Sequence, residues 1–576
     1  MISSPTNLRT GEEKKLEIEK EKEVVDTEWD ENRKIQSWKE QITVRGLVVS
    51  LVIGIMYSII AMKLNLSAGI VPNFNISAAL LAYLFITCWN KVLHKAGFVS
   101  KPFTRQENTI IQTCAVSCYS IAVHGGFASY LLGLNTKTYE LTGVGTEGNN
   151  PNTVRDPGFG WMTAFLFVVC FVGLFILIPL RKIMIVDLKL TFPSGLATAV
   201  LINGFHRQGD KMAKKQVSGF LKYFSVSFLW GFFKWFFQGT QGCGFAQFPT
   251  FGLQAWKQTN DLPTHGESVS ATGSSSLLWN DMATHRTADN ISMWIGSGGY
   301  MVLSVVSVVV IPLMFPQLKW YYVVVAYILA PSLAFCNAYG TGLTDMNMAY
   351  NYGKVALFVV AAMSGRENGV VAGLVGCGLV KSVVSVACTL MQDFKTAYYT
   401  RSSPKAMFVG QLIGTALGCV IAPLSFFLFY KAFDVGNPYG EFKAPYALIY
   451  RNMAVLSVEG FSALPEHCLQ MCYGFFGLAV VVNMVRDLFP KKIGQWMPLP
   501  MVMAIPFLVG AYFAIDMCLG SLVVYVWHKV NANRAEAMLP ATASGLICGE
   551  GLWALPASIL ALAKIYPPIC MKFFPS

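Results

Sequence analysis

Apolar runs long enough to cross a lipid bilayer recur along most of this chain, and they limit the folds open to it. A membrane-spanning helix needs about 20 mainly apolar residues, and a broken or re-entrant helix needs fewer. The segments that qualify are 46–62, 76–89, 109–132, 161–180, 217–237, 293–314, 320–335, 355–363, 369–391, 406–430, 469–485, 498–513, 515–527 and 541–565. The sequence therefore predicts an all-α fold, a polytopic transmembrane helical bundle with broken or re-entrant helices.

The charged residues favour a membrane location over nucleic-acid binding. Only 13% of the residues are charged, whereas soluble domains average about a quarter. The formal net charge is +12, but the Lys and Arg residues fall in short clusters between apolar runs rather than along one polar face. Cytoplasmic loops of membrane proteins carry such clusters. We therefore expect an integral, multi-pass membrane protein that binds no nucleic acid.

Basic loops also orient the predicted helices. Six of these loops are expected on the cytoplasmic side: 91–105, 181–189, 207–215, 395–405, 486–492 and 528–534. Counting helices forwards from the first half leaves the chain outside after 237, whereas counting backwards from the second half places 259–290 inside. The two counts therefore place the chain on opposite sides of the membrane between 237 and 259, where the composition becomes polar. We expect transmembrane sequence to be missing there.

This count divides the chain into four parts. Residues 1–41 form a charged cytoplasmic N-terminal tail, and residues 42–257 form the first transmembrane half. Residues 258–290 are a polar linker, and residues 291–576 form the second transmembrane half.

Polar residues concentrate between two apolar runs at 335–354. This segment is too polar for lipid and too compact for an ordinary loop. An unwound segment that lines a cavity would offer amide and phenol groups to a polar ligand, whereas a solvated loop with helix caps is the alternative. The candidate substrate-binding residues are Asn337, Tyr339, Asp345, Asn347, Tyr350, Asn351 and Lys354.

A second polar cluster at 445–472 supplies Tyr450, Arg451 and Asn452 as further substrate-binding candidates. A desolvated carboxylate here would exchange a proton during transport, whereas an ion pair with Arg451 would serve structure. Ionisable residues within apolar sequence, which include Lys381, either face a pathway or lie near a hydrated interface. The proton-coupling candidates are Glu459, Glu466, His467, Asp516 and Glu550.

Small residues at four-residue spacing predict close helix packing, with a moving hinge as the alternative. They occur at Gly365, Gly369 and Gly373, and again at Gly414 and Gly418. The segments 191–205 and 540–553 share Ser-Gly-Leu. They are either corresponding broken helices of two repeats or similar by chance.

The sequence carries no signature of an enzyme or of a metalloprotein. Cys114 with Cys118, and Cys468 with Cys472, have helical spacing, but no His or carboxylate pattern completes a metal-ligand set around them. Catalytic motifs such as H-E-x-x-H or a nucleophile elbow are missing from the sequence. We expect no enzyme activity, no cofactor and no resident metal.

Several long motifs resemble the yellow stripe-like branch of the oligopeptide transporter family. They are L-T-F-P-S-G-L-A-T-A-V-L-I-N-G-F-H at 190–206, G-L-T-D-M-N-M-A-Y-N-Y-G-K at 342–354, N-G-V-V-A-G-L-V-G-C-G-L at 368–379, D-V-G-N-P at 434–438, Y-R-N-M-A at 450–454 and S-G-L-I-C-G-E-G-L-W at 544–553. The resemblance covers nearly the whole chain and implies a bundle with oligopeptide-transporter-like repeats.

The resemblance implies a secondary transporter that carries metal-nicotianamine or phytosiderophore chelates, of iron and related divalent metals, by proton symport. It also implies the plasma membrane or a vacuolar or other endomembrane of a plant cell. Because a chelator already surrounds its metal, the protein needs partners for carboxylates and amines rather than its own metal ligands. Besides the chelate, the expected partners are protons, the bilayer and a second copy of the chain in a homo-oligomer.

One departure from the family opens alternatives. Family members continue with hydrophobic sequence after a motif like F-G-L-Q-A-W-K-Q-T, whereas this chain continues with Asn260 and a polar run. A truncated, non-transporting isoform or subunit is therefore one alternative. A transporter of small peptide-like molecules without metal is another.

Overall fold

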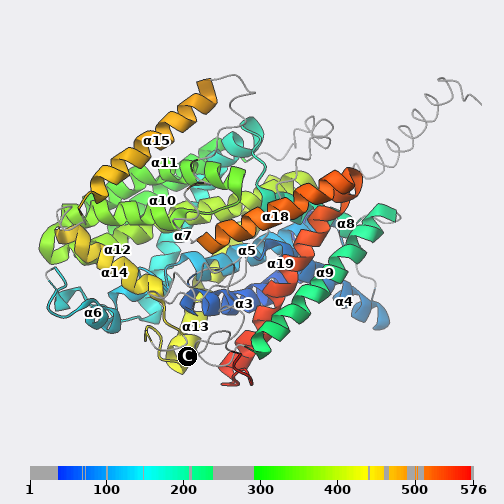
Figure 1. Cartoon of the computed structure of the whole chain (residues 1–576), viewed down its shortest axis with the longest axis horizontal. Helices are drawn as coiled ribbons and strands as arrows, with labels where there is room; N and C mark the ends of the chain where they lie inside the picture. The colour runs from blue at the N-terminus through cyan, green and yellow to red at the C-terminus, as the bar shows by residue number, and fades with distance from the viewer. Residues whose placement is uncertain are drawn as a thin grey trace, which may run out of the picture.

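The computed structural model describes residues 37–237, 291–459, 466–488, 500, 503 and 511–571, apart from 68, 70, 72, 99–100, 147, 207–210 and 439–441. This part of the chain is helical (Figure 1). Its elements are α2 (Trp38–Gln41), α3 (Val44–Ser67), α4 (Asn75–Lys95), α5 (Arg105–His124), η1 (Leu132–Leu134), α6 (Thr136–Thr142), η2 (Pro151–Thr153), α7 (Phe159–Arg181), η3 (Lys182–Asp187), α8 (Pro193–His206), α9 (Lys211–Phe236), α10 (Met293–Met314), α11 (Trp320–Thr344), α12 (Ala349–Thr400), α13 (Pro404–Ala432), α14 (Pro445–Glu459), α15 (Cys468–Leu488), α18 (Ala511–Val530) and α19 (Ala532–Leu562). Nine of the helices described are long and apolar enough to cross a membrane. The predicted all-α, multi-pass bundle is confirmed.

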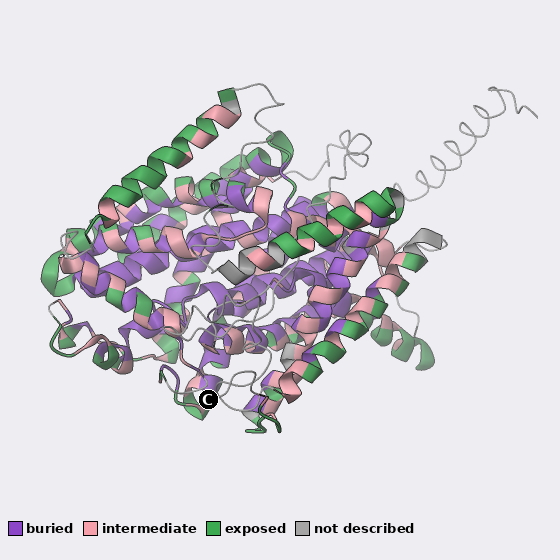
Figure 2. Ribbon diagram, viewed as in Figure 1, coloured by how far each residue is buried: buried purple, intermediate pink, exposed green. Residues whose placement is uncertain are grey.

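Exposed residues follow the outer helices, and buried residues dominate the helices at the centre (Figure 2). Many of the exposed residues have large apolar side chains, whereas many polar side chains are buried. On α10, Val302, Val305 and Val309 are each about two-thirds exposed, at 64%, 65% and 59%. In contrast, Lys381 and Asp393 of α12 are completely buried. Lipid accepts an apolar exterior at no cost, whereas polar groups in a membrane need partners inside the protein.

Glycines bring α5 and α13 into close contact. A Cβ atom added at Gly414 would lie 2.3 Å from the carbonyl oxygen of Cys114, and one at Gly418 would lie 2.4 Å from that of Cys118. Helix axes approach this closely only where a side chain is missing. The predicted packing at both glycines is confirmed.

The helix α12 is a hairpin rather than a straight rod. At Gly365 the backbone turns with φ 76° and ψ −179°, a conformation open almost only to glycine. The two arms then pack together at Ala361. A Cβ atom added at Gly373 would lie 2.7 Å from the Cβ of Ala361, and a Cβ atom added at Gly369 would lie 2.8 Å from the carbonyl oxygen of Ala361. The packing prediction is confirmed for Gly369 and Gly373 and wrong for Gly365, which forms the turn.

The two Ser-Gly-Leu segments pack in the same way but differ in continuity. A Cβ at Gly195 of α8 would lie 2.5 Å from the carbonyl oxygen of Gln392, and one at Gly545 of α19 would lie 2.6 Å from that of Phe220 in α9. However, α19 runs without interruption from Ala532 to Leu562. Of the two alternatives, the one in which 540–553 is a broken helix is therefore wrong, because its neighbours hold it inside a longer helix.

The predicted helix at 109–132 also ends early. The helix α5 stops at His124, and Gly126 has a left-handed φ of 84°. The hydroxyl of Tyr130 then donates to the carbonyl oxygen of Gly125 at 2.8 Å. Consecutive glycines turn the chain although the sequence stays apolar.

Contacts between distant helices show which loops share an end of the bundle. The hydroxyl of Thr109, near the start of α5, lies 3.0 Å from that of Thr400 at the end of α12. The Ser403 amide donates to the side chain of Gln41 at 2.9 Å. The basic loops 91–105 and 395–405 therefore lie at one end, and their charge predicts that this end is cytoplasmic.

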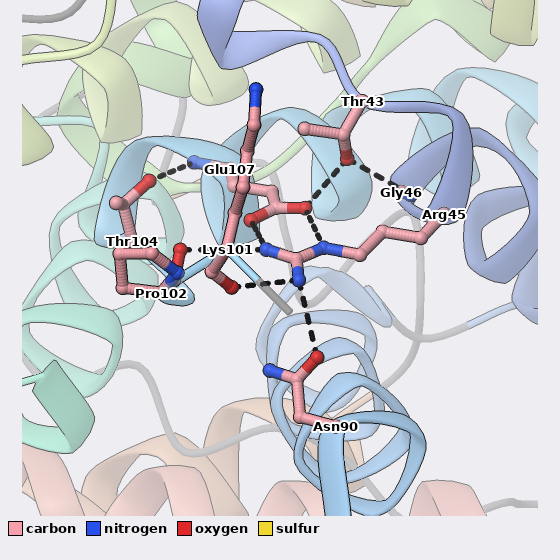
Figure 3. Close-up of polar contacts among 8 residues, drawn as sticks. All are labelled: Thr43, Arg45, Gly46, Asn90, Lys101, Pro102, Thr104 and Glu107. Carbon is pink, nitrogen blue, oxygen red and sulfur yellow. Dashed lines mark hydrogen bonds and ion pairs between the residues drawn. The ribbon is translucent and has the colours of Figure 1, made fainter. Parts of the chain in front are cut away.

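An ion pair fixes the helices at this end (Figure 3). The guanidinium of Arg45 donates to both carboxylate oxygens of Glu107, at 2.6 and 2.7 Å. It also donates to the side-chain oxygen of Asn90 at 3.1 Å and to the carbonyl oxygen of Lys101 at 2.9 Å. Paired hydrogen bonds of this kind are strong and directional. They join α3, α4 and α5.

The end of α9 lies near the opposite end of the bundle. The carbonyl oxygen of Phe236 accepts a hydrogen bond from the amide of Ile569, which follows α19. Near the end of α19, the carbonyl oxygen of Ala557 accepts one from Lys63, close to the end of α3. Since α3 begins at the end of the bundle that holds Arg45, α9 finishes away from that end.

The start of α10, in contrast, lies at the end that holds the basic loops. A Cβ at Gly296 would lie 2.7 Å from the Cβ of Ile178, close to the end of α7. There Arg181 lies over the ring of Phe394 in α12, 5.5 Å from its centroid. The chain therefore changes ends between 237 and 291, which is where the sequence predicts missing transmembrane sequence. The polar linker itself lies outside the described residues.

Candidate functional site

The polar segment at 335–354 contains a helix break. The helix α11 ends at Thr344, Asp345 has a left-handed φ of 64°, and α12 begins at Ala349. The residues 343–348 are half-buried. On the second arm of α12, Gln392 lies beside this break and eight residues before Thr400, which corresponds to about 12 Å of helix. The break therefore lies inside the bundle.

Asp345 connects this break to the beginning of α8. Its carboxylate accepts hydrogen bonds from the Ser194 amide at 3.1 Å and from the Ser194 hydroxyl. The Thr191 hydroxyl and the Phe192 amide both donate to the carbonyl oxygen of Gly342, at 2.9 and 3.0 Å. A carboxylate at a helix N-terminus satisfies free amides and favours the helix dipole. Two motifs that carry the family resemblance thus meet at one site.

A side-chain amide links the site to a second interruption, between α3 and α4. Gln392 donates to Asp345 at 3.2 Å, and its oxygen accepts from Asn73 at 2.8 Å and from Asn75 at 3.3 Å. The hydroxyl of Tyr119 in α5 donates to the side-chain oxygen of Asn75 at 3.3 Å. A continuous hydrogen-bond network therefore joins both interruptions.

Two asparagines stabilise the unwound backbone. Asn337 donates to Asn347 at 2.9 Å and accepts from the Met348 amide at 2.9 Å. Asn347 accepts from the Ala349 amide at 3.1 Å and donates to Ser385 at 3.2 Å. These side chains replace backbone hydrogen bonds that the break removes. They hold the shape of the site in this conformation.

Tyrosines bring the two predicted polar clusters together. The hydroxyl of Tyr450 in α14 donates to the carbonyl oxygen of Tyr350 at 3.1 Å, and the rings of Tyr350 and Tyr446 lie 5.6 Å apart. The ammonium of Lys381 lies 3.9 Å from the centroid of Tyr350 and 3.2 Å from the hydroxyl of Ser129. Its burial excludes the hydrated interface that the sequence left open for Lys381.

Arg451 is completely buried, and its guanidinium holds the loop before α7. It donates to the side-chain oxygen of Asn149 at 3.1 and 2.8 Å, to the carbonyl oxygen of Gly133 at 2.9 Å and to the hydroxyl of Thr153 at 2.8 Å. Burial lowers the pKa of Arg451 to about 10. The alternative of an ion pair with Glu466 or another acidic residue of its cluster does not occur among the described residues.

Of the remaining candidates, Asn351 lies beside the break, where its side chain donates to the sulfur of Met348 at 3.6 Å. Tyr339 and Asn452 are exposed, and Asn351, Lys354 and Glu459 are half-buried. Glu466 and His467 are exposed before α15, and the His467 ring lies 2.8 Å from the side-chain oxygen of Gln470. Glu550 pairs with Lys234 of α9 at 2.5 Å. The side chain of Asp516 lies outside the described residues.

Sequence reasoning missed several residues of the network: Asn73, Asn75, Tyr119, Ser194 and Gln392. The signal of Gln392 is weak because it follows the apolar run that ends at Met391, which places it beyond the predicted helix. In the structure, α12 continues to Thr400. Among the described residues, no group of three or more His, Cys, Asp and Glu side chains is placed to hold a metal ion.

A helical bundle with interrupted helices around buried polar groups is the architecture of a secondary transporter. A family model described as "OPT oligopeptide transporter protein" matches residues 41–272 and 269–561. The chain belongs to the oligopeptide transporter family. It is therefore a multi-pass membrane transporter and not an enzyme.

Curated relatives place it in the yellow stripe-like branch. The chain is 60% identical to "Metal-nicotianamine transporter YSL1" of Arabidopsis thaliana, over 99% of this chain and 98% of the relative. It is 49% identical to "Iron-phytosiderophore transporter yellow stripe 1" of Zea mays, over 100% and 96%. It is 54% identical to "Probable metal-nicotianamine transporter YSL9" of Oryza sativa subsp. japonica, over 93% and 92%.

The comparison with the Arabidopsis protein also measures a difference in length. The alignment spans 663 positions, 87 more than the 576 residues of this chain, so at least 87 positions have no counterpart here. The two stretches that match the family model meet at 269–272, within the polar linker. The expected loss of transmembrane sequence at this linker remains a prediction.

Proposed function

We propose that this chain carries a metal bound to nicotianamine or to a related phytosiderophore across a plant membrane, together with protons. The observation that supports it most is the convergence of Asp345, Ser194 and Gln392, from three separate segments, on a half-buried helix break. The printed names of the relatives supply the class of cargo.

The chemistry of the break suits a chelate better than a bare ion. The N-termini of α8 and α12 both point at it, and a helix N-terminus attracts carboxylates. Asn347 and Gln392 add amide groups that donate and accept. A chelated metal keeps the ligands of its chelator, and the chelator presents carboxylates and amines to these protein groups.

Purified protein in proteoliposomes tests this proposal. We expect radiolabelled iron-nicotianamine to accumulate inside when the outside is more acidic. Free iron without chelator is the matched control and should not accumulate. No accumulation of any defined chelate, under any proton gradient, would reject the substrate class. A fluorescent fusion in plant cells would show whether the plasma membrane or an endomembrane holds the protein.

A non-transporting subunit is the second candidate, and the shortened sequence favours it. At least 87 aligned positions of the Arabidopsis relative lack a counterpart, and the chain changes ends of the bundle between 237 and 291. Inserting the relative's corresponding segment and comparing uptake separates the two candidates. Equal uptake by both forms would favour the transporter, whereas uptake only after insertion would favour the subunit.

A further inference from the structure

Asp393 is a buried carboxyl group that the predicted mechanism did not use. It lies on the second arm of α12 and is completely buried. Its Oδ1 accepts a hydrogen bond from the Gln112 side chain of α5 at 2.8 Å. Its Oδ2 has no hydrogen-bond partner among the residues that the structure describes. Within the described part of the chain, no cation forms an ion pair with it.

The described residues of the helices packed around Asp393 supply no compensating charge. On α5 the titratable Tyr119 already contacts Asn75 through its hydroxyl, and Glu107 is paired with Arg45. Arg181 of α7 lies over the ring of Phe394, and Lys395 of α12 lies over the rings of two tyrosines. The other elements that contact this part of α5 and α12 contribute groups that are uncharged or already hydrogen-bonded. These groups are Met407 and Gln411 of α13, Ser194 and Gly195 of α8, and Asp345 of the break.

An ionised carboxylate in this position would be a buried charge with a single hydrogen bond. Such a charge is strongly unfavourable, because burial removes its hydration and nothing replaces it. A protonated carboxyl group removes the charge. Asn108 lies one turn before Gln112 on α5, and its side-chain oxygen and nitrogen also lack partners within the described part of the chain. A second polar group therefore lies near on the same helix.

Asp393 is also connected to the substrate site through its neighbour in the chain. Gln392 bonds Asp345 on one side and Asn73 on the other. A change in the hydrogen bond between Asp393 of α12 and Gln112 of α5 therefore occurs one residue away from Gln392. Gln392 belongs to the network that joins both interruptions. The exposed Glu466 and the ion-paired Glu550 have no such connection among the described residues.

We propose that the Asp393 carboxyl group takes up and releases the transported proton, an inference that rests on the proposed proton-coupled transport. An O–H bond forms at Oδ2 with a proton from water on one side of the membrane. The same bond breaks when the proton passes to water on the other side. No other reactant is consumed, and this structure represents the protonated state.

Proteoliposomes that contain the wild type, Asp393→Asn or Asp187→Asn test the inference. Asp187 is an exposed aspartate, so its variant is the matched control. Two rates are measured with radiolabelled iron-nicotianamine: accumulation driven by a pH gradient, and exchange with internal unlabelled chelate without a gradient. We expect Asp393→Asn to lose accumulation to background while it keeps wild-type exchange, and Asp187→Asn to keep both.

The outcomes separate this inference from the proposed function. If wild-type accumulation is the same with and without a pH gradient, the proposed proton coupling is wrong. If it follows the gradient and Asp393→Asn accumulates normally, or loses exchange as well, Asp393 is not the coupling group.

A second variant, Gln112→Leu, replaces Asp393→Asn in the test if Asp393→Asn does not fold, because it keeps the Asp393 carboxyl group. Gln112→Leu should move half-maximal accumulation to higher pH, because the ionised form of Asp393 loses its hydrogen bond. An unchanged pH profile would overturn the inference.

Infrared spectroscopy provides a readout that does not depend on transport. A buried, protonated carboxyl group has a C=O stretching band distinct from those of carboxylates and amides. The difference spectrum of wild type minus Asp393→Asn should contain this band at neutral pH, and that of wild type minus Asp187→Asn should lack it. Superimposable spectra for wild type and Asp393→Asn would contradict a protonated Asp393.

Discussion

Replacing Gly195 by alanine tests the contact that positions α8 against the helix break. The added Cβ atom would lie 2.5 Å from the carbonyl oxygen of Gln392, and ordinary contacts begin at 3.4 Å, so α8 must move by about 0.9 Å. The hydrogen bond of 3.1 Å from the Ser194 amide to Asp345 would then lengthen by up to this amount, to at most about 4 Å, which weakens or breaks it.

Gly204 on the same helix is the matched control. A Cβ there would lie 3.9 Å from the nearest heavy atom, the side-chain oxygen of Gln216. Both alanines gain about 1 kcal/mol of helix propensity. The difference between the two variants therefore isolates the steric cost, which is about 1–3 kcal/mol for overpacking.

The assay compares thermal unfolding in detergent and chelate uptake in proteoliposomes for both variants. We expect Gly195→Ala to unfold at a lower temperature than Gly204→Ala and to lose most of its uptake. We expect Gly204→Ala to match or exceed the stability of the wild type and to transport normally. If the two variants unfold and transport alike, the close contact between α8 and α12 does not position the site.

Three further substitutions test separate parts of the structure. Asp345→Asn removes the charge that holds α8 and should abolish uptake with normal membrane insertion; normal uptake would make Asp345 structural only. Arg451→Met leaves the buried acceptors of Asn149 and its neighbours without donors and should cost about 3 kcal/mol, seen as a lower unfolding temperature; an unchanged temperature would refute this. Gly365→Ala places a side chain at φ 76° and should cost about 1–3 kcal/mol although no heavy atom lies within 4 Å; wild-type stability would show that the turn relaxes.

The apolar runs predicted the helices well because lipid imposes one requirement on every lipid-facing residue. The run at 293–314 coincides with α10, and the run at 217–237 with most of α9. Where a helix is buried in protein, hydropathy no longer marks its end. For this reason α12 continues nine residues beyond Met391, through Gln392 and Asp393.

Glycine spacing predicted close packing but could not identify the turn. Gly365 and Gly369 are equivalent in the sequence pattern, yet one forms the hairpin and the other packs against Ala361. The distinction depends on which arm lies opposite, and a local spacing does not contain that information. The same holds for 540–553, where neighbouring helices keep α19 continuous.

The candidate site was partly predictable. The density of polar residues identified the break at Asp345, because only a lined interior accepts such groups within a membrane. Its partners Ser194 and Gln392 come from segments 151 and 47 residues away in the chain. No local pattern pairs them, so their convergence follows only from the three-dimensional fold.

The most direct test of the proposed site is a structure of the protein with nickel-nicotianamine bound. We expect the chelate to lie against residues 345–348 and the beginning of α8, with its carboxylates near Ser194, Asn347 or Gln392. A chelate bound only elsewhere, for example between α9 and α19, with the break at Asp345 unchanged and unoccupied, would contradict the proposed role of this site.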